Sequence, residues 1–196
     1  MSTRIDDLET TAPDVVGAWR GIGEGRLLEV RRRVRNRAGE GTAEGIARQL
    51  GAVAAGLASI VEALPDAAFA MPGGEGDWNV AQALGHAADS RVGLAMAGSL
   101  AASGRWPTDA PVVVLGIPGA ADAPREALLR RLASSQRIVE RAARAIAGHE
   151  AEPCPLDHPL VGRLRCGEWL LFAGVHDLMH LDQLAALEAQ LAGSHR

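Results

Sequence analysis

The stretch Trp169-Leu-Leu-Phe-Ala-Gly-Val-His176-Asp-Leu-Met-His180-Leu-Asp-Gln183 places two histidines four residues apart in an apolar helical pattern. Side chains at such spacing lie one above the other on the same helix face. At 100° per residue, His180 lies about 40° from His176, on the stripe that carries Trp169 and Phe172. This stripe is expected to face a core. An unsatisfied buried polar group costs ~1–3 kcal/mol, so the two imidazoles need either ordinary hydrogen bonds or a shared metal ion.

The composition is that of a soluble globular domain. The chain has 196 residues, of which 47% are hydrophobic and 22% charged, with a net charge of −4. This balance does not favour nucleic acid or an anionic membrane as a partner. The first residues lack the apolar segment of a secretion signal, and apolar windows such as 50–64 are interrupted by Gly, Ser and Glu, so we expect no membrane span. The two cysteines form no Cys-x-x-Cys motif, which fits a cytoplasmic protein with free thiols.

Residues 1–40 are predicted to form an N-terminal extension, helical or irregular, ahead of a bundle domain at 41–196. Apolar residues between Val15 and Val34 recur at helical spacing, but several glycines interrupt them. The segment Gly21-Ile-Gly-Glu-Gly25 lacks the strand and the spacing of a phosphate-binding turn. The basic cluster at 31–37 is interpreted as a solvated helix face.

Residues 41–196 contain four long helical patterns. The first follows Thr42 and ends before Pro65, and the second is predicted to start at an Asp77 cap and to reach about Ser103. The third opens at Asp122-Ala-Pro124, and the fourth runs from about Cys166 to Leu191. Residues 104–121 and 148–165 are predicted to be loops. The fold class is therefore all-α, an antiparallel four-helix bundle with the N-terminal extension.

The second helix offers one histidine, His86. Its neighbours on the helix face are polar and include Asn79, Gln82, Asp89 and Ser90. Periodicity alone favours a surface position for His86. The alternative is a polar cleft at one end of the bundle, where a bundle can build a site from facing helices.

Three motifs in this order resemble the DinB/YfiT superfamily. They are Trp78-x7-His86, His158-Pro-Leu-Val-Gly162 and Trp169-x6-His176-x3-His180-x2-Gln183, and the resemblance covers roughly residues 44–193. One departure is Arg165, which stands where members often have the Ser or Thr of a capping box ahead of Glu168. The resemblance implies a four-helix bundle, frequent homodimers, and a divalent metal held by three histidines, here His86, His176 and His180.

The resemblance also implies a class of reaction. Members include thiol S-transferases that use mycothiol or bacillithiol, a mycothiol-dependent maleylpyruvate isomerase, and metal-dependent hydrolases. Three neutral imidazoles leave an open coordination position, as in catalytic sites, and they suit Zn, Ni or Fe equally. Abundant Ala, Gly and Arg with no Lys suggests a high-GC genome, which favours mycothiol as the thiol.

The leading hypothesis is a cytoplasmic, metal-dependent transferase that joins a low-molecular-weight thiol to an electrophilic small molecule. Its partners would be the substrate, the thiol and a second copy of the chain, with neither nucleic acid nor a membrane involved. One alternative is a stress-related protein that binds a metal and a ligand without turnover, and another is a metal-dependent hydrolase. The remaining alternative is a structural helical protein whose histidines are incidental.

Polar residues near these histidines have two interpretations. Asp89 and Gln183 lie one turn from His86 and His180, where they either orient a ligand or are ordinary surface groups. Asp177 and Asp182 point away from the ligand stripe and are predicted to be solvated.

The other histidines and Cys166 have weaker assignments. His158 lies in the loop before the last helix and could approach the site, whereas His149 and His195 are predicted to be exposed. Cys166 falls in the first turn of that helix, where the helix dipole is expected to lower the pKa of its thiol. Without a neighbouring base, however, a nucleophilic role is not favoured.

Overall fold

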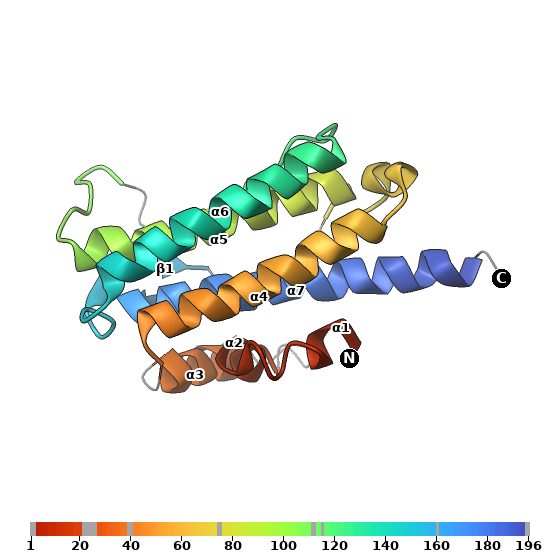
Figure 1. Cartoon of the computed structure of the whole chain (residues 1–196). Helices are drawn as coiled ribbons and strands as arrows, with labels where there is room; N and C mark the ends of the chain where they lie inside the picture. The colour runs from red at the N-terminus through yellow and green to blue at the C-terminus, as the bar shows by residue number, and fades with distance from the viewer. Residues whose placement is uncertain are drawn as a thin grey trace.

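Four long helices form the body of the computed structural model, which describes residues 3–20, 27–38, 41–73, 76–110, 113–114, 116–159 and 161–194 (Figure 1). They are α4 (Ala43–Ala63), α5 (Val80–Ala102), α6 (Arg125–Ile146) and α7 (Cys166–Ser194). Helices α4 and α5 each pack against both α6 and α7, which gives the order α4–α6–α5–α7 around the bundle. The predicted all-α four-helix bundle is confirmed.

The long connection between α5 and α6 sets the helix directions. Arg125, the first residue of α6, donates hydrogen bonds to the carbonyls of Val61 and Leu64, where α4 ends. The short helix η2 (Asp66–Ala70) leads from the same end of α4 into α5. Helices α5 and α6 therefore run in the same direction, and the antiparallel neighbours are α4–α6 and α5–α7 (Figure 1). The described residues of the 103–124 connection return to α5, where the Gly119 N–H bonds to the Gln82 carbonyl at 3.0 Å.

Most helix ends follow the sequence signals. Thr42 caps α4 by accepting a hydrogen bond from the Gly45 N–H at 3.1 Å, and α4 ends just before Pro65. The predicted Asp77 cap of α5 is wrong, because Asn79 and Gln82 form a capping box two residues further on. Part of a capping box also survives at α7, where the Glu168 carboxylate accepts the Arg165 N–H at 2.8 Å.

The predicted loop at 148–165 contains a hairpin that the sequence analysis missed. Strands β1 (Pro153–His158) and β2 (Gly162–Arg165) pair antiparallel, with His158 opposite Gly162. Gly162 has φ +68°, a conformation that glycine adopts without a steric penalty. The signal was a short alternation, since Cys154 and Leu156 are buried whereas Pro153 and Pro155 are exposed. The hairpin carries His158 to the site.

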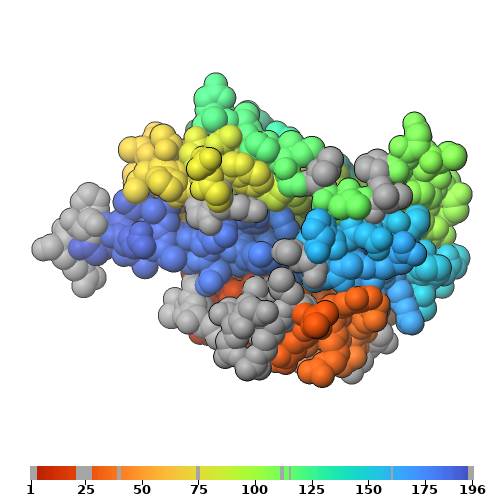
Figure 2. All heavy atoms as spheres, turned by 180° about the vertical axis from the view of Figure 1, so that it is seen from behind, coloured from red at the N-terminus to blue at the C-terminus, as the bar shows by residue number. Residues whose placement is uncertain are grey.

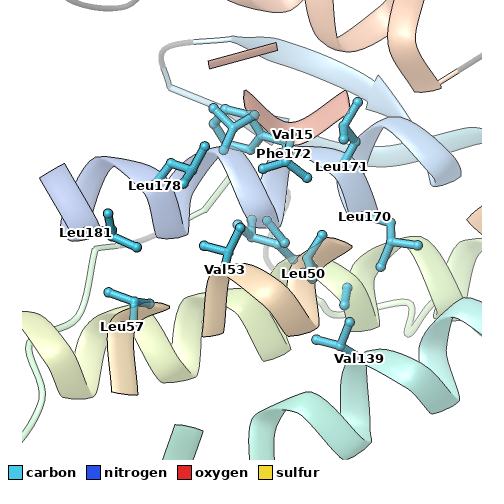
Figure 3. Close-up of a cluster of buried hydrophobic side chains, with 14 of the residues drawn as sticks. Val15, Leu50, Val53, Leu57, Val139, Leu170, Leu171, Phe172, Leu178 and Leu181 are labelled. Atoms are coloured by element: carbon cyan, nitrogen blue, oxygen red, sulfur yellow. The ribbon is translucent and has the colours of Figure 1, made fainter. Parts of the chain in front are cut away.

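The N-terminal residues form α1 (Thr3–Asp6), α2 (Pro13–Trp19) and α3 (Leu27–Ala38), which all contact α7. Val15 of α2 joins the same apolar core as α4, α6 and α7 (Figure 3). A Cβ at Gly174 would lie 2.8 Å from Leu50 and 2.9 Å from Val15, so α2 and α4 approach α7 closely there. The segment Gly21–Gly25 lies outside the described residues.

The basic cluster of α3 is not simply a solvated helix face, because several of its arginines form ion pairs. Arg33 pairs with Glu29, Arg37 with Asp14, and Arg35 with Glu168 of α7. Arg32 keeps 73% of its side chain exposed and lies 3.8 Å from Glu29. The cluster therefore ties α3 to its neighbours.

Helix α4 is long and apolar enough to cross a bilayer by length and composition alone, unlike every other helix of the described residues. Its apolar side chains, from Ile46 to Ile60, are buried against α6 and α7. Core packing thus accounts for its composition.

Candidate metal centre

Three histidines meet between α5 and α7. His86 comes from α5, and His176 and His180 come from successive turns of α7. One ring nitrogen of each lies within 4.8 Å of the others, and the Nε2 atoms of His86 and His176 are 3.3 Å apart. Nitrogens bound tetrahedrally at ~2.0–2.1 Å from one ion would be separated by roughly 3.3–3.4 Å. The structure therefore brings together the three predicted ligand residues in a cluster that could hold a metal ion.

The connection between α5 and α6 orients His86. The Nδ1 atom of His86 lies 2.8 Å from the carbonyl oxygen of Ile117. Because a carbonyl only accepts, Nδ1 carries the proton and Nε2 keeps its lone pair toward the cluster. Ser90, one turn along α5, places its Oγ 3.2 Å from the same Nε2.

Two glycines let this connection approach α5. A Cβ at Gly85 would lie 2.9 Å from the Cα of Gly119, and the Gly119 N–H bonds to the Gln82 carbonyl at 3.0 Å. The connection covers the polar face of α5 and leaves His86 only 5% exposed. The surface position favoured by periodicity is therefore wrong, because periodicity cannot show what a distant loop covers.

Gln183 orients His180 in the same manner. Its Oε1 lies 3.1 Å from Nδ1 of His180, so this amide oxygen accepts the Nδ1 proton and leaves Nε2 for the cluster. Such hydrogen bonds fix the tautomer of metal-binding histidines. Asp89 takes no comparable role, since its carboxylate is paired with Arg131 of α6.

The prediction that Asp177 is solvated is wrong. Asp177 and Arg91 of α5 are both 0% exposed, and the Arg91 Nε lies 3.1 Å from an Asp177 carboxylate oxygen. Arg91 also donates to the Leu50 carbonyl at 3.0 Å and to Gln136 at 2.8 Å. The sequence signal was an arginine on the apolar side of the second helix. Asp182, by contrast, is half-buried.

Burial favours the neutral forms of His176 and His180. It lowers the pKa of His176 well below the ordinary value, and the nearby His180, His86 and His158 lower it further. Burial, and then His86, lowers the pKa of His180 to about 4, although the Gln183 hydrogen bond opposes the shift. The Nδ1 of His176 is buried without a hydrogen-bond partner in the described structure. Converging neutral imidazoles with available lone pairs are the donor set that a divalent transition metal prefers.

The cluster forms one wall of a cavity of about 740 Å³. His158 lies in another wall, with its ring centroid 4.9 Å from that of Phe172, and burial lowers its pKa. The sequence left the approach of His158 to the site open, and the structure places His158 in the cavity lining. His149 is exposed beside Glu152, as predicted, and His195 lies outside the described residues.

Other residues near the site differ from expectation. Cys166 is buried, and this burial, followed by Cys154 and Glu152, raises the pKa of its thiol to about 12. The predicted lowering by the helix dipole is therefore wrong. The Trp78 ring packs against His86 at an interplanar angle of 59°, with the ring centroids 4.8 Å apart, a contact that its spacing did not reveal. The Ile117 carbonyl was also missed, because no side-chain pattern marks a backbone acceptor.

These features define a helical bundle protein whose histidine triad can hold a metal ion. A model of the DinB superfamily, a metal-binding family, matches residues 49–184, and the chain belongs to this superfamily. No curated protein and no solved structure matches the chain.

Proposed function

We propose that the protein binds a divalent metal ion through His86, His176 and His180 and uses it to transfer a low-molecular-weight thiol to an electrophilic small molecule. The observation that supports this proposal is the position of the triad in the wall of a cavity of about 740 Å³. Ligand sites in proteins commonly have volumes of about 300–1,000 Å³. A metal ion buried in a core without such a cavity would have no access to a substrate.

A divalent ion held by three neutral imidazoles keeps its charge and an open position, so it lowers the pKa of a bound thiol or water. The residues of the chain prepare this site. The Ile117 carbonyl and the Gln183 amide hold the ring protons of His86 and His180 away from the cluster. Apolar side chains such as Leu94, Phe172 and Met179 line the cavity and exclude water from the reacting groups.

The overall reaction requires no redox partner. The thiol loses its proton, its sulfur forms a bond to an electrophilic carbon, and the leaving group departs with the electron pair of the broken bond. Thiolate is the reactive form, so a site that favours ionisation of the thiol accelerates the attack. We further propose that the thiol is mycothiol. We also propose that the protein assembles as a homodimer, and light scattering of the purified protein would test this assembly.

Metal binding is tested first, by elemental analysis of the purified protein and of three variants, His86→Ala, His176→Ala and His180→Ala. Each variant is expected to lose the bound metal. His149→Ala is the matched control, because His149 is exposed and pairs with Glu152. Equal metal content in all four variants would exclude the triad as the metal site.

Transfer is tested next on the metal-loaded protein. Thiol consumption is followed with a chloronitroaromatic electrophile and, in turn, mycothiol, bacillithiol and cysteine. We expect metal-dependent consumption that is fastest with mycothiol and that is lost in His176→Ala. Full metal content without consumption of any thiol would reject transfer and favour a binding protein.

A further inference from the structure

The N-terminal helix α3 completes the cavity, although it lies outside the residues that match the superfamily. Val30 of α3 is 1% exposed and lines the cavity beside Leu156 and Val161 of the hairpin region. Two contacts fix α3 in this position. The Arg35 Nε lies 3.7 Å from the Glu168 carboxylate, and its Nη2 donates to the Arg163 carbonyl at 3.3 Å. Figure 2 shows α3 (orange) along one side of α7 (blue).

The walls away from the triad are mainly apolar, with His158 as a polar member. They come from α3, α5, the α5–α6 connection, the hairpin region and α7, and include Val30, Leu94, Val114, Leu156, Phe172 and Met179. Such a wall offers area for an aromatic or aliphatic group and few hydrogen bonds.

The lining offers no cation for an anionic substrate. Among the described residues that line the cavity there is no arginine, and the chain contains no lysine. Arg31 contacts Gly162, where its Nη1 would lie 3.4 Å from an added Cβ, and it is not part of the lining. The one carboxylate in the described lining, Asp89, is paired with Arg131. A carboxylate buried away from the triad would lose its hydration without gaining a counter-ion.

We infer that the cavity selects an electrophile whose body is neutral and apolar, an aryl or alkyl group rather than a dicarboxylate, and that α3 helps to determine this selection. That the ligand reacts as an electrophile rests on the proposed function. The preference for a neutral, apolar ligand depends only on the cavity lining. If a metal ion held by the triad took the thiol, the second substrate would depend on the apolar walls for its binding.

The preference is tested with matched ligands that do not react. On the metal-free protein, binding of 2-naphthalenemethanol is compared with binding of 2-naphthoate by calorimetry at pH 7.5. The alcohol is expected to bind at least tenfold more tightly. Equal or tighter binding of the naphthoate would overturn the inference. Because this comparison needs neither a metal nor turnover, its result is independent of the proposed function.

The role of α3 is tested with two variants of similar size change. Val30→Ala removes two methyl groups from the cavity wall and is expected to weaken binding of the naphthyl alcohol at least threefold. Leu28→Ala is the control on the same helix, because Leu28 is 80% exposed and should leave binding unchanged. Circular dichroism establishes that both alanine variants fold. Val30→Gln keeps the wall filled and provides a second test, because it should weaken binding of the naphthyl alcohol more than binding of the naphthoate. If both Val30 variants bind the naphthyl alcohol with unchanged affinity, α3 does not determine which ligand the cavity selects.

Discussion

The Nε atom of Arg91 lies 3.1 Å from a carboxylate oxygen of Asp177, and both side chains are fully buried. Arg91 belongs to α5, which carries His86, and Asp177 directly follows His176 on α7. This ion pair therefore joins the two helices that supply the triad. Burial raises the pKa of Asp177, and the Arg91 guanidinium opposes that rise.

Breaking this pair should destabilise the fold strongly. Removing one partner of a buried ion pair leaves an uncompensated charge and costs ~3–5 kcal/mol, so we expect such a loss for Arg91→Met. Urea unfolding of the metal-free protein measures it. The double variant Arg91→Met/Asp177→Leu should recover part of the loss, because neither charge remains. If the double variant loses as much free energy of unfolding as Arg91→Met and Asp177→Leu lose together, the two residues are not coupled.

The sequence predicted the fold better than it predicted the surroundings of the site. Thr42 and Pro65 bound α4 as expected, because capping and proline act locally on the backbone. His86 could not be placed by periodicity, since a connection more than thirty residues away covers its helix face through the Gly119 contact. Asp177 was misplaced for a related reason, as its partner lies on another helix. Interactions between distant segments leave no periodic signal in one sequence.

The contacts that orient the ligands should affect metal affinity without removing a ligand. Gln183→Leu deletes the acceptor of the His180 ring proton, and such changes lower metal affinity by ~10–100-fold. Competition with a chromophoric chelator measures the effect. Gln190→Leu is a control on the same helix, at an exposed position. Equal affinities of the two variants would contradict the orienting role of Gln183.

Gly119→Ala should displace the connection over α5. Its Cβ would meet the Cα of Gly85 at 2.7 Å and the Gln82 carbonyl at 3.0 Å, so the backbone must shift. We expect the hydrogen bond from His86 to Ile117 to lengthen and the metal affinity to fall about tenfold. Gly104 differs, because it has open space around its Cβ position and φ +63°, so Gly104→Asn provides a control in the same connection. An unchanged metal affinity of Gly119→Ala would show that this close approach is not needed.

The two cysteines should be unreactive in the folded protein. Burial raises the pKa of Cys154, which disfavours its thiolate, and it raises that of Cys166 to about 12, so almost no Cys166 thiolate forms at pH 8. Labelling with a chromogenic disulfide reagent should be slow in buffer and complete in about 6 M guanidinium, which unfolds the protein. Cys166→Ala should keep its thiol-transfer rate, because the transferred thiol comes from solution. Rapid labelling of the folded protein would contradict the burial of both thiols.

Acid should destabilise the metal-free protein through its buried histidines. The pKa of His180 is lowered to about 4 by burial, whereas an unfolded histidine has a pKa of ~6.5. As the pH falls, His180 takes up a proton at pH ~6.5 in the unfolded chain but only at about pH 4 in the folded chain. The free energy of unfolding therefore decreases between these two pH values.

For His180 alone the loss between pH 7 and pH 5 is about 2 kcal/mol. His176, whose pKa is lowered well below its ordinary value, adds to the loss. Metal-free His180→Gln cannot take up this proton, so its stability should fall by about 2 kcal/mol less than that of the unmodified protein over the same interval. Urea unfolding at pH 7, 6 and 5 measures both slopes, and His149→Gln, at an exposed position, should retain the slope of the unmodified protein. Parallel curves for His180→Gln and the unmodified protein would show that the folded and unfolded chains bind the His180 proton equally, which would contradict the lowered pKa of this buried imidazole.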